Sequence, residues 1–325
     1  MRIRVVFVAF AVAVALGVAI GAQQPPPATT QQGAGAQGQG GGRGGGGRGA
    51  APAPNPNAMH VYIRAGLKSH GEGQHDYPQF LADWSKILTE RGAIVDGSLH
   101  SPSALELENI DVIVMYKGDA GYLTDREKAD LEAFVKRGGG IVSFHDTLCG
   151  PDPEYFSAML TGGAKKHGET NFSQGMLHYT IVDKTNPIMA GMEDFDIQEE
   201  AFMLMTWAKS PQIHPLATVA MPGGTHQGEV VPQIWTYEHT VPGGQPSRAF
   251  VWMQGHTYKN FTDPRIQPMI LRGISWAAKK PFEALMTVQA SRGGRGVGGS
   301  DIVVPTPATP PATPPARGGS TAGGT

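Results

Sequence analysis

Apolar and polar positions along the chain follow two periods, and their order predicts an α/β protein. Short apolar runs at 60–65, 110–115 and 141–144 are typical of strands, and the run at 110–115 is almost continuously apolar, as in a strand buried on both faces of a parallel sheet. Apolar residues recur at helical spacing between Tyr77 and Leu88, and Thr124 and Glu127 form a capping box that opens a second helix. This order predicts a flavodoxin-like, doubly wound sheet that is mostly parallel.

The second half of the chain has a different pattern. Strand-like segments follow one another without long helices between them, at 176–183, 216–221, 231–237 and 248–254. The last two are expected to form a hairpin. Asp263 and Pro264 then precede a final helix with an apolar face from Ile266 to Ala277. We therefore expect the parallel sheet to continue into an antiparallel extension.

Composition divides the chain into four parts. Residues 1–22 combine Arg2 and Arg4 with an apolar run and a small-residue exit, as in a secretory signal peptide, although an uncleaved membrane anchor is an alternative. Residues 23–58 are rich in Gly, Pro and Gln, and residues 285–325 in Gly, Pro and Thr. Both segments hold too few large apolar side chains to build a core, and we expect them to be disordered. Residues 59–284 form the predicted domain, and the protein is expected to be secreted or periplasmic.

Charge and cysteine content narrow the function classes. The 325-residue chain has a formal net charge of −2. Seven of its 26 Lys and Arg but only one of its 28 Asp and Glu fall outside 59–284, so this part carries a net charge of −8. An acidic domain argues against a nucleic-acid partner, and nothing beyond the export signal points to a membrane. Cys149 is the single cysteine, so no intrachain disulfide can form.

Candidate chemistry gathers where predicted strands end, which is where open α/β sheets bind their ligands. The candidates follow four strands: His70, His75, Asp119, His145, Asp146 and His256. The alternatives are solvated loop histidines for His70 and His75, a half-buried histidine for His145 and a turn cap for His256. We expect His100, His214, His226 and His239 to be surface residues.

Neutral imidazoles in such loops could also hold a divalent transition metal such as zinc, with His70, His75, His145 and His256 as the candidate ligands. Cys149 lies beyond the strand-to-helix elbow that a nucleophilic cysteine needs, and His145 occupies the elbow itself. We therefore interpret Cys149 as a structural thiol.

From residue 60 to 281 the sequence resembles the ThuA-like (trehalose-utilisation) family, a branch of the class I glutamine-amidotransferase-like superfamily whose members lack the nucleophilic cysteine. The resemblance rests on ordered motifs along the chain: Ser69-His70-Gly71 with His75, Gly138 to His145, Leu160 to Gly163 with His167, Asn186-Pro187-Ile188, Glu199-Glu200, Val231 to Trp235, Arg248 to His256, and Arg272 to Ala277. The chain departs from the family pattern in two places. Glu199 replaces the usual Asp of an Asp-Glu pair, and Val241 to Arg248 lengthen a tight hairpin.

The resemblance implies a role in carbohydrate metabolism, on disaccharides such as trehalose or their 3-keto derivatives, and no glutamine amidotransferase activity. The first hypothesis is acid–base chemistry on a sugar, with His145, Glu200 and His256 as catalytic residues. The residues expected to bind substrate are His70, His75, Asp119, Asp146 and Trp235. A bound metal could assist by stabilising an enediolate.

Two alternatives remain open. Glycoside hydrolysis needs two carboxylates across one bond, but Glu199 and Glu200 are adjacent and would face opposite sides of a strand. A non-catalytic carbohydrate-binding or interaction module would need only aromatic side chains to stack on a sugar.

Overall fold

The computed structural model describes residues 57–166 and 172–289. The predicted signal peptide, nearly all of the predicted linker and most of the predicted C-terminal tail lie outside these ranges. Within them, no helix combines the length and the apolar character that crossing a membrane requires.

A nine-stranded sheet runs through the described part of the chain, in the order β2-β1-β3-β4-β12-β11-β10-β7-β8. Its strands are β1 His60–Ala65, β2 Ile94–Ser98, β3 Val112–Tyr116, β4 Gly140–Phe144, β7 Phe172–Ile181, β8 Phe195–Phe202, β10 His214–Ala220, β11 Val230–His239 and β12 Ser247–Trp252. A second, three-stranded sheet contains β5 Cys149–Gly150, β6 Gly163–Lys166 and β9 Thr206–Trp207.

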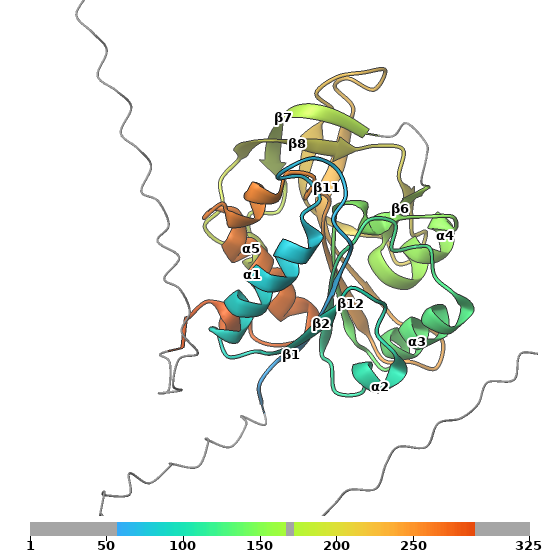
Figure 1. The fold of residues 1–325 in the computed structure, drawn as a ribbon. Helices are drawn as coiled ribbons and strands as arrows, with labels where there is room; N and C mark the ends of the chain where they lie inside the picture. Colours follow the sequence, from blue (N-terminus) through green and yellow to red (C-terminus); the bar gives the residue numbers. More distant parts are fainter. Residues whose placement is uncertain (1–56, 167–171, 290–325) are drawn as a thin grey trace, which may run out of the picture. The chain divides into compact units, whose positions relative to one another are not determined.

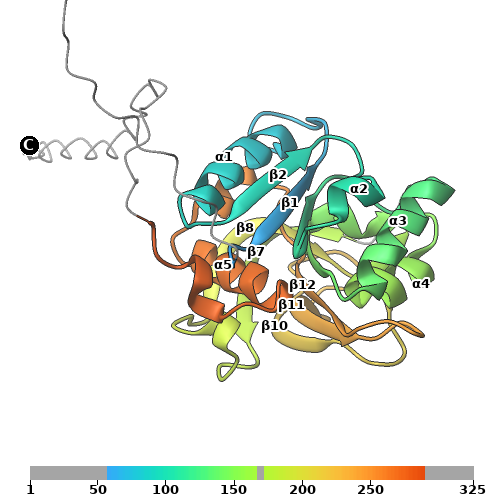
Figure 2. The ribbon, with the colours of Figure 1, turned by 90° about the horizontal axis from the view of Figure 1, so that it is seen from below.

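Helices cover both faces of the parallel strands. The α-helices are α1 Tyr77–Thr89, α2 Ala104–Leu107, α3 Asp125–Lys136, α4 Pro153–Phe156 and α5 Ile266–Ala277. Shorter turns of helix are η1 His145–Leu148, η2 Ser157–Thr161, η3 Pro187–Met189, η4 Tyr258–Thr262 and η5 Phe282–Leu285. Helices α1 and α5 lie on one side of the sheet and α2, α3 and α4 on the other (Figures 1 and 2). Two separate apolar clusters result, one on each face.

Strand direction changes in the middle of the sheet. β2, β1, β3, β4 and β12 pair in parallel, and β12, β11, β10, β7 and β8 pair antiparallel. The predicted α/β architecture with its antiparallel extension is therefore confirmed, and so is the hairpin of β11 and β12. The capping box of α3 is present as predicted, with Glu127 N–H donating to Thr124 Oγ1. β8 was not predicted as a strand, because the alternation that begins with Phe195 and Ile197 breaks at Glu199, a polar residue at a buried position.

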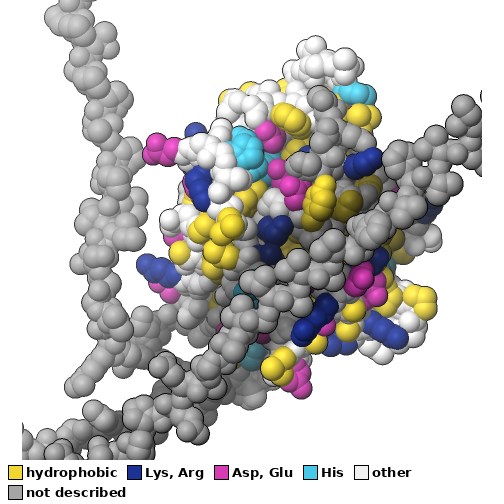
Figure 3. Space-filling view, turned by 45° about the vertical axis from the view of Figure 1, so that its right-hand side comes forward, with side chains coloured by type: hydrophobic (Ala, Val, Ile, Leu, Met, Phe, Trp, Pro, Cys, Tyr) yellow, Lys and Arg dark blue, Asp and Glu magenta, His cyan; other side chains and the backbone are white. Residues whose placement is uncertain are grey.

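The surface shown in Figure 3 carries basic and acidic side chains interspersed with apolar ones. No single sign of charge dominates that face.

Candidate functional site

Three loops at the carboxyl ends of parallel strands bring three distant histidines together. His75 follows β1, His145 follows β4 and His256 follows β12. The first and third loops are tied by backbone hydrogen bonds, from His75 N–H to the His256 carbonyl at 3.0 Å and from Tyr258 N–H to the Gly73 carbonyl at 2.9 Å. The ends of β1, β4 and β12 therefore form a single site.

Backbone strain is concentrated in these loops. His75 has φ 46° and His145 has φ 52°, conformations that side chains other than Gly rarely adopt. Gly255 has φ 143°, and a Cβ added there would lie 3.1 Å from the His145 Cβ. Strain of this kind persists where the surrounding structure imposes it, and it is typical of functional sites.

The three imidazoles point their nitrogens at a common centre. His75 Nε2 lies 2.9 Å from His145 Nε2 and 3.0 Å from His256 Nδ1, and the three ligand atoms all lie within 4.8 Å of one another. A neutral ring nitrogen carries either one proton or one lone pair, so a single nitrogen cannot form well-directed hydrogen bonds to both neighbours. Tetrahedral zinc ligation spaces nitrogens at about 3.3 Å, so the two shorter separations are close to that spacing, whereas the widest, 4.8 Å, exceeds it.

The outer nitrogens of two of these rings are held in place. Tyr77 Oη lies 2.9 Å and Ser69 Oγ 3.2 Å from His75 Nδ1, and the Met253 carbonyl lies 3.3 Å from His145 Nδ1. Such contacts fix ring orientation in metal sites. Burial, and next the neighbouring His145, lower the pKa of His75 to about 2. Burial also lowers the pKa of His145 and of His256, so all three rings are neutral and able to donate lone pairs.

Glu200 on β8 completes one side of the site. Its carboxylate lies 3.3 Å from His256 Nδ1 and 3.6 Å from His145 Nε2, and it accepts a hydrogen bond from the Gln174 amide on the paired strand. The neighbouring Glu199 faces the other way. It accepts hydrogen bonds from Gly255 N–H at 3.1 Å and Thr257 N–H at 2.8 Å, and so anchors the loop that carries His256. Burial raises the pKa of Glu199 to about 7, although these donors oppose the shift.

Asp146 borders the site on the side of η1. Its carboxylate lies 3.8 Å from His145 Nε2 and 3.3 Å from Lys165 Nζ, and Cys149 Sγ donates to it at 3.2 Å. Burial opposes its ionisation, but His145 and Lys165 lower its pKa below the ordinary value. Burial raises the pKa of the Cys149 thiol, which keeps it protonated and unsuited to nucleophilic attack.

The other predicted residues lie at the rim of the site or away from it. His70 is exposed, with its ring centroid 3.9 Å from that of His75, and is not one of the three converging ligands. Asp119 lies beside Asp146, to whose carbonyl its N–H donates at 3.0 Å. Trp235 is fully buried in the core, with its indole N–H bonded to the Thr161 carbonyl at 2.7 Å. As placed, Trp235 cannot stack on a sugar.

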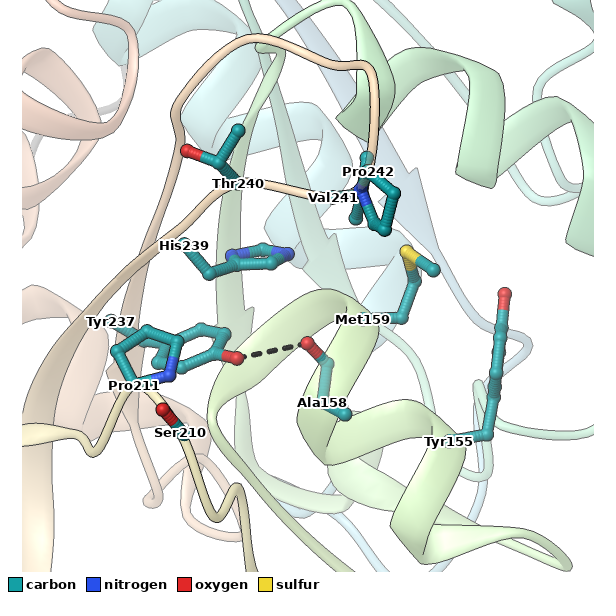
Figure 4. A pocket seen from close by; sticks show the side chains of 10 residues that line it. All are labelled: Tyr155, Ala158, Met159, Ser210, Pro211, Tyr237, His239, Thr240, Val241 and Pro242. Carbon is teal, nitrogen blue, oxygen red and sulfur yellow. Dashed lines mark hydrogen bonds between the residues drawn. The ribbon is translucent and has the colours of Figure 1, made fainter.

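His239 is a correction to the sequence analysis. It was expected at the surface, but only 8% of it is exposed, because β11 extends through it and its ring stacks on Tyr237 with centroids 4.6 Å apart. It lines a hollow of about 260 Å³ beside Met159 and Pro211 (Figure 4).

Several residues of the site were not singled out as site residues by the sequence analysis. Tyr77 was interpreted only as a core position of α1, and Gln174 and Lys165 were not considered. A register between the strands at 172–181 and 195–202 would have revealed Gln174, since it lies directly opposite Glu200. Tyr77 gives no such signal. A tyrosine on the apolar face of a helix looks the same in the sequence whether its hydroxyl bonds to a site residue or not.

Comparison with known proteins decides the family. The family model for ThuA, described as trehalose utilisation, matches residues 67–277. The chain belongs to the ThuA family. A putative ThuA-like protein from Bacteroides uniformis has a similar structure, with 17% identity and a TM-score of 0.54 over 73% of this chain and 100% of that one. One from Parabacteroides merdae has 16% identity and a TM-score of 0.47 over 69% and 91%. A search of curated proteins gives no significant match. As a ThuA family member, the protein has a carbohydrate-related role in general.

Proposed function

We propose that this ThuA protein is an enzyme that acts on a keto-sugar at a three-histidine divalent-metal centre. The convergence of the His75, His145 and His256 nitrogens at the strand ends is the observation that carries the proposal. All three residues are buried, burial lowers the pKa of each ring, and their nitrogens lie within 4.8 Å of one another, so a zinc-like ion could draw them into one ligand set.

Glu200 supplies the base in this proposal. His145 is completely buried, which leaves it no access to a substrate carbon, whereas the Glu200 carboxylate lies at the inner edge of the centre. A ketone acidifies the neighbouring C–H bond. The proton moves to the Glu200 carboxylate, the electron pair of the C–H bond forms a C=C bond, and the π pair of the C=O bond moves to the oxygen, which gives an enolate. A bound metal would supply a Lewis acid for that oxygen.

Metal content of the full chain tests the centre. We expect about one equivalent of a transition metal in the purified protein, measured by elemental analysis, and its loss in the His75→Ala, His145→Ala and His256→Ala variants. His178→Ala is the matched control, because His178 is exposed and bonds only to Asp196. Metal that stays in all three variants would refute the centre.

Solvent exchange tests the reaction. The protein is incubated with 3-keto-trehalose in D₂O, and deuterium incorporation next to the ketone is followed by NMR. We expect Glu200→Gln to slow the exchange about 100-fold or more while the metal is retained. Saturable sugar binding without exchange in the unmodified protein would instead favour the non-catalytic binding module.

Export is part of the proposal. The signal-like residues 1–22 and the linker that follows suggest a secreted or periplasmic protein, and the mature chain would begin near Gln23. N-terminal sequencing of the protein from fractionated cells tests this. A protein that is found in the membrane fraction and still begins at residue 1 would indicate the uncleaved anchor.

A further inference from the structure

A buried arginine that forms no close ion pair with a described carboxylate lies on the opposite side of β1 from α1. Arg64 is the next-to-last residue of β1 and only 7% of it is exposed. Its Nη1 donates to the adjacent Ala65 carbonyl, but its Nε is buried with no hydrogen-bond partner, and it forms no ion pair with any carboxylate of the described residues. A buried guanidinium left without an anion is unfavourable, and most proteins pair it.

Arg64 lines a small cavity of about 40 Å³ at the ends of β1 and β3. The strand order changes direction between these two strands, and such a switch point is where open α/β sheets bind ligands. Lys117, the residue after β3, also lines the cavity, and so do apolar side chains such as Ile113 and Leu131. The cavity is large enough for a few waters or the head of a small oxyanion.

The acidic residue of the cavity, Glu127, attracts Arg64 electrostatically but forms no ion pair with it. Glu127 on α3 lines it as well, but Glu127 Oε2 is bound by Thr124 N–H and Thr124 Oγ1, each at 2.8 Å, in the capping box. Lys117 Nζ is held by the carbonyls of Gly118 at 2.8 Å and Asp119 at 3.1 Å, so its charge adds to that of Arg64. Two cations therefore face one carboxylate whose Oε2 already accepts two hydrogen bonds, and the side chains that line the cavity carry a net positive charge.

We propose that this cavity is an oxyanion-binding site, in which Arg64 takes a carboxylate or phosphate oxygen through its free Nε edge and Lys117 adds a second positive charge. The Nε edge of a guanidinium has the geometry of a bidentate carboxylate contact. The site is separate from the histidine centre and does not depend on the proposed function, since Arg64 and Lys117 are not among the residues that contact His75, His145 or His256.

Calorimetric titration of the full chain with sodium formate and, separately, with inorganic phosphate at constant ionic strength tests the proposal. We expect one equivalent of anion to bind, and Arg64→Met to weaken the affinity about 10- to 100-fold. Arg64→Met should fold, because replacing a lone buried charge by an apolar group of similar size is neutral or stabilising. Arg248→Met is the control, since Arg248 is paired with Glu238 at the surface, and His145→Ala should bind the anion normally.

The two titrants distinguish the source of the oxyanion. If formate binds more tightly than phosphate and Arg64→Lys no longer binds it, the ligand is a carboxylate that needs the planar guanidinium group. Tighter binding of phosphate, largely retained in Arg64→Lys, indicates a phosphate. Equal affinities in the unmodified protein and Arg64→Met, or no binding of either anion to the unmodified protein, would overturn the proposal.

Discussion

The close packing around the Gly255 backbone helps to position the histidine centre. The Gly255 backbone passes so close to Tyr116 and His145 that an added Cβ would lie 2.9 Å from the Tyr116 ring and 3.1 Å from the His145 Cβ. Contacts this short leave no room for a side chain at residue 255. The position of His256 therefore depends on glycine at the preceding residue.

Gly255→Ala should therefore displace the His256 loop. We expect a loss of about 1–3 kcal/mol in the free energy of unfolding, from crowding and from the positive φ, and a loss of metal at the centre. Gly224→Ala is the matched control, because Gly224 also has a positive φ (81°) but nothing lies within 4 Å of its added Cβ. Urea unfolding and elemental analysis measure the two effects. Equal effects of both substitutions would mean that strain alone, and not the contact with His145, matters.

The Tyr77 hydroxyl acts through His75. Tyr77→Phe removes the 2.9 Å contact to His75 Nδ1 and should weaken metal affinity about 10- to 100-fold with little change in fold. Competition with a chromogenic chelator measures the affinity. Tyr62→Phe, which removes a hydroxyl bonded to Ser98 away from the centre, should leave it unchanged. A Tyr77→Phe protein with unaltered metal affinity would show that Ser69 alone orients the ring.

At the scale of elements, a turn after β7 links this strand to β10. Asp183 Oδ1 accepts hydrogen bonds from Thr185 N–H, Thr185 Oγ1 and Asn186 N–H, and Oδ2 lies 2.7 Å from His214 Nε2. The hydrogen bonds from Thr185 and His214 lower the pKa of Asp183 to about 2. A carboxylate with a depressed native pKa stabilises the fold at pH values above its unfolded pKa of about 4, and this contribution is lost as the pH falls to 2.

Asp183→Asn should therefore be less stable than the unmodified protein at pH 5 by about 1 kcal/mol, a value reduced for the partial exposure of the turn. The difference should shrink at pH 2.5. Urea unfolding at the two pH values measures it, with Asp96→Asn as the control because Asp96 is exposed on β2. A difference that stays constant with pH would show that Asp183 contributes through packing only.

The sequence predicts the strands and helices of this fold well where apolar runs are continuous, as in β3 and β4, and poorly where buried positions are polar. β8 was missed for that reason, since Glu199 and Glu200 are polar and yet buried. The site, too, was predicted only in part. His75, His145 and His256 were identified because residues that follow strands share one edge of a sheet. Which of four histidines converge depends on loop conformation, and a positive φ at residues 75 and 145 leaves no mark in the sequence.

For the whole molecule, the proposed metal would couple ligand binding to folding. An ion held by residues from three separate loops binds the folded chain and not the unfolded one, so a metal present at 100 times its dissociation constant stabilises the fold by about 2.7 kcal/mol. Removing it with a chelator should lower Tm by roughly 5–10 °C for a domain of this size. Differential scanning calorimetry before and after dialysis against a chelator measures the shift, and zinc added back should restore Tm. A chelator that lowers the Tm of His145→Ala equally would exclude this centre as the cause.

The place of β12 in the sheet sets the order in which the molecule can be made. Among the described strands, β4 and β11 are connected only through β12, which pairs in parallel with one and antiparallel with the other. β12 is also the last of the described strands to be synthesised, and His256 comes four residues after its end. A nascent chain therefore holds two half-sheets that cannot join, and two of the three histidines without the third. Maturation waits for the final quarter of translation, and the proposed metal is acquired in whichever compartment the finished chain folds.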